Sequence, residues 1–392
     1  MKADWEAQSI ASFAKTGAGG TPKKSTKAFY EGGNIPWLLS GEVANANIVE
    51  AKNSITPEGL KGSSAKLFPA NSVLVAMYGA TAGQVGILRF EAATNQAVCA
   101  ILPSDQHIPE YLYYYLLHAK PSLVAQAVGN AQPNISQAKI KSLEIPLPPL
   151  EEQQRIVAVL DEAFEGLARA RAHAEANLQN ARELFAGTIA SEFAKIEPSG
   201  KRKVGDIAVH SLGKMLDKNK NKGTLRPYLR NLNVRWFTVD TSDLLEMRIT
   251  DAEVERYTVR QGDLLICEGG YPGRSSIWEE DDEIFFQKAL HRVRFEDEAY
   301  SRLLMYFLYM SDQSGALQEY CSGAGIQHFT GQSLAKFEMP FPSVSVAKKM
   351  IVTIEAMHRS SMELEGHFQQ KLQDIDDLRQ SLLQKAFAGE LT

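Results

Sequence analysis

A glycine-containing loop in the first quarter of the chain has residue types that could bind phosphate. In LFPANSVLVAMYGATAGQVGIL, residues 67–88, an apolar run leads directly into a loop that contains Gly79, Gly83 and Gly86. Glycine loops that follow strands often hold phosphate with their backbone N–H groups. A P-loop needs a lysine after its last glycine, whereas Gln84 follows Gly83 here. A dinucleotide-binding loop opens a helix, but the sequence QVGILRF predicts a strand. Neither class of nucleotide site is therefore expected.

The acidic run EEDDE at residues 279–283 could be taken for a metal site. Consecutive carboxylates on an extended chain point to alternate sides, so we favour a solvent-exposed turn. The chain has only three cysteines, at positions 99, 267 and 321, and no closely spaced pair of Cys or His. This pattern argues against a zinc site and against a disulfide framework. We expect no metal site, and a reducing compartment such as the cytoplasm.

The glycine loop has a second copy about 190 residues later. In YTVRQGDLLICEGGYPGRSSIW, residues 257–278, Gly269 aligns with Gly79 and Gly273 aligns with Gly83. Further pairs follow in the same order: IPWLLSGEV with RPYLRNLNV, TNQAV with FFQKAL (Gln96 with Gln287), EYLYYYLL with RLLMYFLY, GNAQPNIS with GAGIQHFT, and LEIPLPPL with FEMPFPSV. Matches in one order predict an internal duplication. Each glycine loop is then either a plain hairpin or a loop whose backbone approaches a ligand.

A long helix is predicted after each copy. The first runs from Glu151 to about Glu192 without proline, and its apolar residues recur at alternating steps of three and four, as in a coiled-coil seam. The second predicted helix is more polar between His358 and Glu365. The predicted seam residues are Ile156, Leu160, Leu167, Leu178 and Phe185 in the first helix and Ile351, Ile354, Phe368, Leu372, Ile375 and Leu382 in the second. Two equal seams most simply pack together, and we expect them to be antiparallel. The alternative is that each helix packs only on its own domain.

The charge of the chain is unevenly distributed. The 392 residues carry 42 Lys and Arg against 47 Asp and Glu, yet residues 201–235 contain ten basic residues against two acidic ones. Such a stretch indicates either a nucleic-acid contact or solvated surface. No run of about 18 apolar residues predicts a membrane span.

These features predict an α+β protein with two similar mixed α/β domains. A long antiparallel two-helix coiled coil would separate them, and the internal repeat would be pseudo-two-fold. The expected boundaries are 1–149 for the first domain, 150–197 for the first spacer helix, 198–342 for the second domain and 343–392 for the second spacer helix. A stiff spacer between two related domains suits a long, periodic ligand such as DNA.

Several motifs resemble those of one family, the specificity subunits of type I restriction-modification enzymes. They are GGTPKKS at 19–25, YEGGNIPWLLSGEV at 30–43, MYGATAGQVGIL at 77–88, TNQAV at 94–98, GNAQPNISQAKIKSLEIPLPPLEEQQRIV at 129–157, and the helical tail LLQKAFAGEL. The junction of the prolines with EEQQRI is the most specific of these. The second half departs from the pattern, because SVSVAKKMIV stands at its junction and GGYPGRSS in its glycine loop.

The resemblance implies that each domain is a target-recognition domain that reads one part of a bipartite, asymmetric DNA sequence. It implies that the coiled coil sets the spacing and docks two modification subunits, which bind S-adenosylmethionine and methylate adenine. Two restriction subunits would add ATP- and Mg-dependent translocation and cleavage. The complex would be a methyltransferase and endonuclease, whereas this chain would be a non-catalytic cytoplasmic subunit without a cofactor. Consistent with this, the sequence lacks the motifs of an adenine methyltransferase, a Walker ATPase and a helicase.

The predicted DNA contacts lie on matching loops of the two copies. Phosphate contacts are expected from Lys23, Lys24, Lys27, Lys218, Lys220, Lys222 and Arg226. Base contacts are expected from Ser40, Tyr78, Thr81, Gln96, Gln132 and Asn134 in the first half and from Arg230, Asn231, Tyr271, Arg274, Gln287, Lys288, Gln327 and His328 in the second, since Arg suits guanine and Asn or Gln suits adenine. The same loops add Thr21, Gly79, Gly83 and Gly273. Trp37 and Tyr228 are expected to be core or platform residues instead, and the tyrosine-rich segment 111–115 is expected in the core.

A second hypothesis has a different functional class. The chain could be a coiled-coil scaffold whose two domains bind protein or RNA. A gel shift with DNA, with and without a methyltransferase partner, would discriminate the two hypotheses. An autonomous enzyme is disfavoured because the catalytic motifs are absent.

Overall fold

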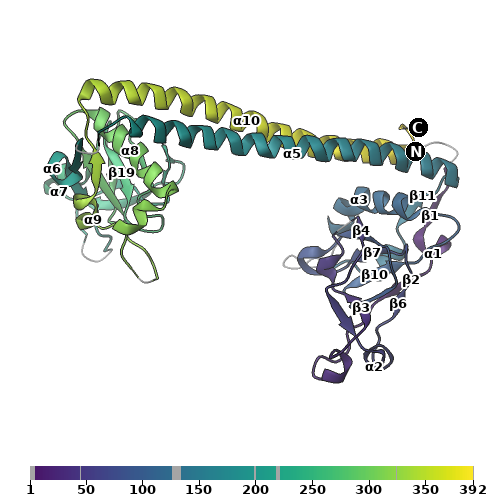
Figure 1. The fold of residues 1–392 in the computed structure, drawn as a ribbon. Coiled ribbons are helices and arrows are strands. Elements are labelled where there is room, and N and C mark those ends of the chain that lie inside the picture. Colours follow the sequence, from purple (N-terminus) through teal and green to yellow (C-terminus); the bar gives the residue numbers. More distant parts are fainter. Residues whose placement is uncertain are drawn as a thin grey trace. The chain divides into compact units, whose positions relative to one another are not determined.

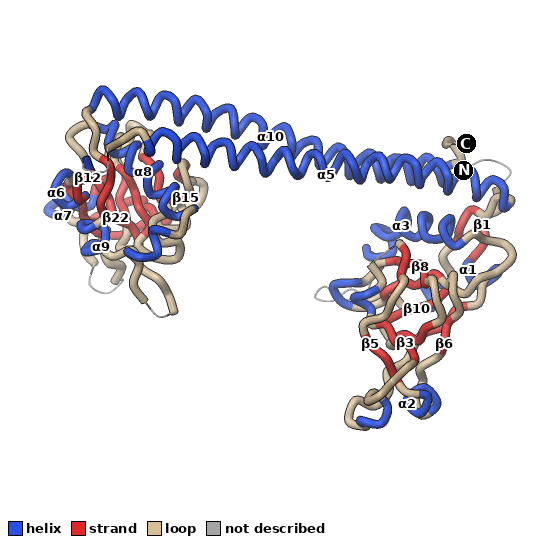
Figure 2. The backbone as a smooth tube through the Cα atoms, viewed as in Figure 1, coloured by secondary structure: helices blue, strands red, loops and turns tan. Residues whose placement is uncertain are grey.

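The computed structural model describes residues 5–44, 46–125, 134–197, 200–217, 221–323 and 325–391. The chain divides into two compact units, Met1–Ala174 with Gln370–Thr392 and Glu175–Gln369. Figure 1 traces the chain through both, and Figure 2 shows that the strands of each unit gather into one β body with helices around it. None of the helices within the described ranges combines the length and hydropathy that a membrane-spanning segment needs.

The first unit contains two mixed sheets. Their orders are β2-β10-β7-β8-β4 and β5-β3-β9-β6. The strands are β2 (Thr16–Ala18), β3 (Ile35–Leu38), β4 (Asn47–Ile48), β5 (Asn53–Ile55), β6 (Leu67–Phe68), β7 (Val73–Ala76), β8 (Val85–Leu88), β9 (Ala92–Thr94) and β10 (Val98–Ile101), while β1 (Ala7–Ser9) pairs with β11 (Glu144–Pro146). Strand β7 is buried along its whole length, which is why its sequence is apolar without alternation.

The second unit repeats this topology, except that its first sheet has four strands where that of the first unit has five. Its sheets have the orders β13-β22-β19-β20 and β17-β14-β21-β18. The strands are β13 (Val209–Leu212), β14 (Thr224–Leu229), β17 (Leu245–Ile249), β18 (Thr258–Val259), β19 (Leu264–Cys267), β20 (Ser275–Ile277), β21 (Ile284–Phe286) and β22 (Leu290–Arg294), while β12 (Lys201–Lys203) pairs with β23 (Glu338–Pro340). The parallel pair β14 and β21 corresponds to β3 and β9. The internal repeat is thus confirmed, and the hairpin of β15 (Val234–Arg235) and β16 (Thr238–Val239) is an addition.

Short helices complete each unit. They are α1 (Ile10–Phe13), η1 (Lys27–Phe29), η2 (Ser40–Glu42), α2 (Pro57–Lys61), η3 (Gly79–Thr81), α3 (Pro109–Ala125) and α4 (Gln137–Lys141) in the first unit, and α6 (Val204–Ile207), α7 (Asp251–Tyr257), α8 (Glu298–Gln313), η5 (Ala316–Tyr320) and α9 (Gly331–Lys336) in the second. Helix α3 packs on β7 and β8, and α8 packs on β19, β20 and β22. Tyr111, Tyr113 and Tyr114 of α3 are buried, as are Trp37 and Tyr228, so these predicted core positions are confirmed, whereas Tyr115 is half-buried.

Two long helices, α5 (Leu150–Ala194) and α10 (Val344–Ala388), contribute to both units. In the first unit the Arg379 guanidinium lies 5.0 Å from the ring centroid of Phe164. In the second, the rings of Phe185 and His358 stack with centroids 4.6 Å apart. Later residues of α5 therefore contact earlier residues of α10, which confirms the antiparallel pairing. Within each unit the two helices lie side by side (Figure 1).

The seam of this pair is apolar, with one buried polar position. Ile156, Leu160, Phe185, Ile351, Ile354 and Ile375 are buried, whereas Leu167, Leu178, Phe368, Leu372 and Leu382 are half-buried. At the polar stretch of α10, the buried Ser361 hydroxyl donates to the Ala181 carbonyl at 3.0 Å, and Arg182 pairs with Glu365 at 2.9 Å. The polar residues are thus satisfied across the pair, so the seam continues through this stretch.

The ends of the two helices also cover the domain cores. Phe387, near the end of α10, packs edge-on against Tyr111 and Tyr115 with centroid distances of 5.4 and 5.0 Å. The start of α5 reaches the same core through Ile156 and Leu160. Helix α10 follows the second domain in sequence but ends in the core of the first. The alternative in which each helix packs only on its own domain is therefore excluded.

Candidate nucleic-acid interface

Several loops of the first unit meet at one end of its sheets. Strand β10 is antiparallel to β2 and β7, so the residues that precede β10 lie beside those that follow the other two. The Met77 amide donates to the Ala97 carbonyl and the Ile135 amide to the Met77 carbonyl, each at 2.8 Å. The Asn95 amide donates to the Leu38 carbonyl at 2.9 Å. We call these joined loops, residues 19–21, 38–40, 77–83, 94–97 and 134–135, the first loop cluster.

The second unit builds the same arrangement with the same backbone hydrogen bonds. The Glu268 amide donates to the Ala289 carbonyl at 2.9 Å and the Phe329 amide to the Glu268 carbonyl at 2.7 Å. The Gln287 amide donates to the Leu229 carbonyl at 3.1 Å. Residues 213–214, 229–231, 268–274, 286–289 and 327–329 form this second loop cluster.

A further backbone bridge defines the register between the two copies. Tyr78 pairs with Asn134 in the first cluster, and Gly269 pairs with His328 in the second. Tyr78 thus corresponds to Gly269, one residue away from the predicted alignment. Asn134 and His328, both predicted to contact bases, are exposed at equivalent positions.

The predicted alignment of Gly79 with Gly269 is wrong by one residue. Gly79 corresponds to Gly270, because these two have positive φ angles of 69° and 76°. Gly83 and Gly273 do correspond, with φ of 79° and 84°. The second loop is therefore one residue shorter between its two left-handed glycines, which shifted the alignment by sequence.

The predicted pairing of Gln96 with Gln287 is also wrong by one residue. The hydrogen bonds to Leu38 and Leu229 make Asn95 the equivalent of Gln287, so Gln96 corresponds to Lys288. Both Gln96 and Lys288 are exposed, whereas Gln287 is half-buried.

Polar side chains gather on the first loop cluster. The Thr21 hydroxyl donates to the side-chain oxygen of the exposed Gln96, and the Thr81 hydroxyl donates to the Tyr78 carbonyl at 3.2 Å. The Tyr78 side chain is exposed and Ser40 is half-exposed at the start of η2. Gln132, also predicted to contact a base, lies outside the described residues.

Gly83 has a structural reason to be glycine. A Cβ atom there would lie 2.9 Å from Val124 Cγ2 and 3.1 Å from Lys120 Cγ, and its φ is positive. The loop therefore packs closely against the end of α3, and this contact accounts for the glycine without a ligand.

Aromatic, amide and basic side chains gather on the second loop cluster. Arg274 donates from Nη2 to the Asn231 carbonyl at 2.9 Å, and its guanidinium lies 5.0 Å from the ring centroid of Tyr271. Gln327 and Tyr271 are exposed. Arg230 is already engaged, because its guanidinium donates to the Asp243 carboxylate at 2.7 Å.

The predicted phosphate-contacting residues lie on exposed surface where they are described. These are Lys23, Lys24, Lys27, Lys222 and Arg226, while Lys218 and Lys220 lie outside the described residues. One lysine of the basic stretch, Lys214, is instead buried and pairs with Glu253. The hydrogen bond from Lys214, together with one from the Thr250 amide, lowers the pKa of Glu253 to about 2. Part of the basic stretch is therefore structural.

Sequence reasoning missed Gln84. It occupies the position of Arg274, because the Ala76 amide donates to the Gln84 carbonyl at 2.9 Å as the Cys267 amide does to the Arg274 carbonyl at 2.8 Å. Gln84 Oε1 and Arg274 Nε are both buried without a hydrogen-bond partner among the described residues. Each residue directly follows the second left-handed glycine of its loop, and this spacing could have identified Gln84.

The acidic run is an exposed turn, as predicted. Glu279 pairs with Arg302 at 2.9 Å and Glu283 with Arg260 at 3.0 Å. In the part of the chain that the structure describes, no group of three or more His, Cys, Asp or Glu side chains could hold a metal ion.

This chain is similar in sequence to known proteins, and the match to a family model lies in its first half. The family model described as the type I restriction modification DNA specificity domain matches residues 2–173. The EcoR124I/EcoR124II specificity subunit of Escherichia coli is 30% identical over 161 residues, which are 40% of this chain and 40% of that protein. The MjaIX specificity subunit of Methanocaldococcus jannaschii is 32% identical over 40% of this chain and 37% of its own length. Each of these two matches thus spans about two fifths of the length of the relative. The EcoKI specificity subunit of E. coli K12 is 22% identical over 91% of this chain and 82% of its own length.

Solved structures share the whole fold. A chain determined in work on the assembly and conformational transition of the type I R-M system has a TM-score of 0.78, with 17% identity over 98% of both chains. The HsdS subunit from Thermoanaerobacter tengcongensis has a TM-score of 0.57, with 16% identity over 100% of this chain and 98% of that one. At these identities the likeness concerns the fold alone.

Proposed function

Because the chain belongs to the specificity subunits of type I restriction-modification systems, we propose that it selects the DNA sequence on which such a system acts. One observation carries this proposal. The same loop cluster is built twice on equivalent backbone hydrogen bonds, yet equivalent positions carry different polar side chains, such as Asn134 against His328 and Gln84 against Arg274. A duplicated scaffold with unlike side chains suits the reading of a bipartite, asymmetric DNA sequence.

Each loop cluster would read one part of the target by direct contact with base edges. Amide side chains such as Gln96 and Asn134 suit adenine, and the guanidinium of Arg274 suits guanine. The exposed Lys23, Lys24 and Lys222 would contact phosphates, which position a protein on the duplex without distinguishing sequences. Specificity would therefore reside in the loops and affinity largely in the lysines.

The helix pair would set the spacing between the two parts of the target and dock the partner subunits. Exposed large apolar side chains on α5 and α10 offer apolar area for docking. Among them are Leu184, Val352, Met362 and Leu364. The partners would be two modification subunits, which bind S-adenosylmethionine, and two restriction subunits, which use ATP and Mg. This chain would bind no cofactor and would act with the DNA in the cytoplasm.

The alternative, a scaffold with protein- or RNA-binding domains, is not favoured, because the relatives named above are specificity subunits. The test is to assemble the chain with the modification subunits of its system and to map methylated sites by sequencing. We expect one bipartite motif, and no methylation by the chain alone. Exchanging residues 1–146 for those of a relative should change one half of the motif only. Methylation by the lone chain, or a folded exchange variant that changes both halves, would contradict the proposal.

A further inference from the structure

One amide side chain holds the glycine loop of the second domain in place. Asn231 follows β14 and is half-buried. Its Nδ2 atom donates to the Gly269 carbonyl at 3.1 Å, and its own carbonyl accepts from Arg274 Nη2 at 2.9 Å. The two ends of the 269–274 loop are therefore both attached to the same residue.

The loop packs against this amide without free space. A Cβ atom on Gly270 would lie 2.5 Å from Asn231 Nδ2, and Gly270 has a φ of 76°. A side chain at position 270 is thus strained by the backbone conformation and would displace the amide. One N–H of this amide is therefore used within the protein, where it supports the loop backbone.

Arg274 lies at the other end of this loop and is held by the main chain of Asn231, whose side chain holds the start of the loop. Its Nη2 atom is bonded to the Asn231 carbonyl, and its guanidinium lies over the exposed ring of Tyr271, 5.0 Å from the centroid. Two contacts hold a planar group that would otherwise sample many rotamers. A guanidinium restrained in this way has a pre-organised fork of donors, the group that pairs with O6 and N7 of guanine.

The first domain lacks this device. The hydrogen bonds to Leu38 and Leu229 place Ser40 at the position of Asn231. Serine has no amide with which to bridge the loop, and the first loop is one residue longer between its left-handed glycines. The positioning is therefore a property of the second loop cluster.

We propose that Asn231 does not read a base itself but is a positioning residue, which acts through Arg274 in the recognition of a guanine in the second half of the target. This inference rests on the proposed function and deepens it, because it assigns the contact with the base to Arg274 and the positioning of the loop to Asn231.

The test measures base preference in the assembled methyltransferase, with sites mapped at single-base resolution. Asn231→Ala and Arg274→Ala are compared alone and together. Each single variant should lower the preference at the same base pair by roughly tenfold, and the double variant should lose no more than Arg274→Ala alone. Asn231→Asp is the matched variant: it keeps the shape but cannot donate to the Gly269 carbonyl, so it should behave like Asn231→Ala. The preference for the first half of the target should be unchanged, which shows that the protein is folded.

Different failures have different meanings. If Asn231→Ala changes a base pair that Arg274→Ala leaves intact, or if the two losses multiply in the double variant, Asn231 is a reader and the inference is wrong. If Asn231→Ala has no effect while Arg274→Ala has one, the inference fails but the proposed function stands. If the wild-type complex shows no sequence preference, the proposed function fails and the inference fails with it.

Discussion

At the scale of single residues, equivalent positions of the two loop clusters differ in hydrogen-bonding type although their backbones match. Gln96 corresponds to Lys288 and Asn134 corresponds to His328. An amide both donates and accepts, whereas an ammonium only donates. The two domains can thus share one scaffold and prefer different bases, because base edges are distinguished by their pattern of donors and acceptors.

The first prediction concerns Gln96, whose side chain is exposed and hydrogen-bonded to Thr21. Gln96→Ala should relax the preference for one base pair in the first half of the target, at a cost of about 1–3 kcal/mol, because a contact to a base edge is lost. Gln106→Ala is the matched control, since Gln106 is exposed beyond the opposite end of β10. Mapping of methylated sites measures the effect. Equal behaviour of the two variants would remove Gln96 from the set of readers.

The second prediction concerns one buried histidine in each domain. Burial lowers the pKa of His107 to about 4 and that of His291 to about 4, with nearby His210 adding to the second shift. In the unfolded chain these groups have the ordinary pKa near 6.5. The unfolded state therefore binds more protons between these values, so stability is full above about pH 6.5 and falls as the pH drops toward 4.

Replacing either histidine should reduce the stability that the domain loses at acid pH. His291→Gln should make the free energy of unfolding of the second domain less sensitive to acid by about 1–2 kcal/mol between pH 7.5 and pH 5, and His107→Gln should do so for the first. Urea unfolding at the two pH values measures the change. His367→Gln, at an exposed position of α10, should keep the acid sensitivity of the wild type. If the buried and exposed variants lose the same stability between the two pH values, the buried histidines are not the cause of the acid sensitivity.

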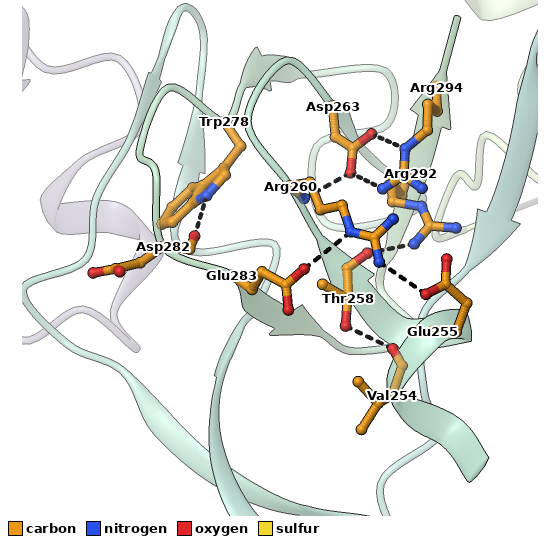
Figure 3. Close-up of polar contacts among 10 residues, drawn as sticks. All are labelled: Val254, Glu255, Thr258, Arg260, Asp263, Trp278, Asp282, Glu283, Arg292 and Arg294. Carbon is orange, nitrogen blue, oxygen red and sulfur yellow. Dashed lines mark hydrogen bonds and ion pairs between the residues drawn. The ribbon is translucent and has the colours of Figure 1, made fainter. Parts of the chain in front are cut away.

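At the scale of elements, the second domain joins its two sheets with a network of charges (Figure 3). Asp263, in the turn before β19, accepts two hydrogen bonds of 2.6 Å from Arg294 of β22 and one of 2.8 Å from the Arg260 amide. The neighbouring Arg292 donates to the carbonyl of Thr258 in the other sheet. The matching backbone hydrogen bonds place Ser72 and Leu102 at the positions of Asp263 and Arg294 in the first domain.

The third prediction follows from the burial of this pair. Only 2% of the Asp263 side chain is exposed, so Asp263→Ala would leave the Arg294 guanidinium without its carboxylate in a poorly solvated place. The second domain should lose about 3 kcal/mol of stability, the lower end of what breaking a buried pair costs, because Arg294 is 31% exposed. Denaturant unfolding provides the measurement. Asp281→Ala, in the exposed acidic turn, should change stability little. A loss below about 1 kcal/mol for Asp263→Ala would show that solvent already screens the pair.

At the scale of the whole molecule, the two long helices complete the core of each domain. The core of the first domain includes Phe387 from the end of α10, and the core of the second includes Phe185 from α5. Neither domain is therefore completed by its own stretch of sequence. The length of each long helix depends on the number of residues in it.

The fourth prediction tests whether these helices set the spacing of the target. Inserting four residues after Ala174 and four before Gln370 adds about one turn, roughly 5.4 Å, to both helices and nearly preserves the seam. Since DNA advances roughly 3.4 Å per base pair, the unspecified gap between the two recognised parts should lengthen by one or two base pairs. The recognised bases should stay the same. Sequencing of methylated sites checks this, and an unchanged gap in an active, folded variant would rule out the helices as the ruler.

The sequence alone was sufficient for the repeat, the long helices and the buried positions. Those features depend on local patterns: proline and glycine mark the ends of elements, and apolar spacing distinguishes strand from coiled-coil helix. Trp37, Tyr228 and the first three tyrosines of α3 are buried, as this spacing predicts. Family-typical motifs at the junction before α5 added the expected role.

Only the tertiary structure decided which side chains of the loops are free to contact a ligand and which are already bonded within the protein. Arg230 is engaged by Asp243, Lys214 by Glu253 and Asn231 by Gly269, although each is a polar residue of a predicted loop. The register between the glycine loops also depended on hydrogen bonds between segments 20 to 60 residues apart. The physical reason is the same in each case. A partner distant in sequence satisfies a charge or an amide, and local composition contains no information about where that partner lies.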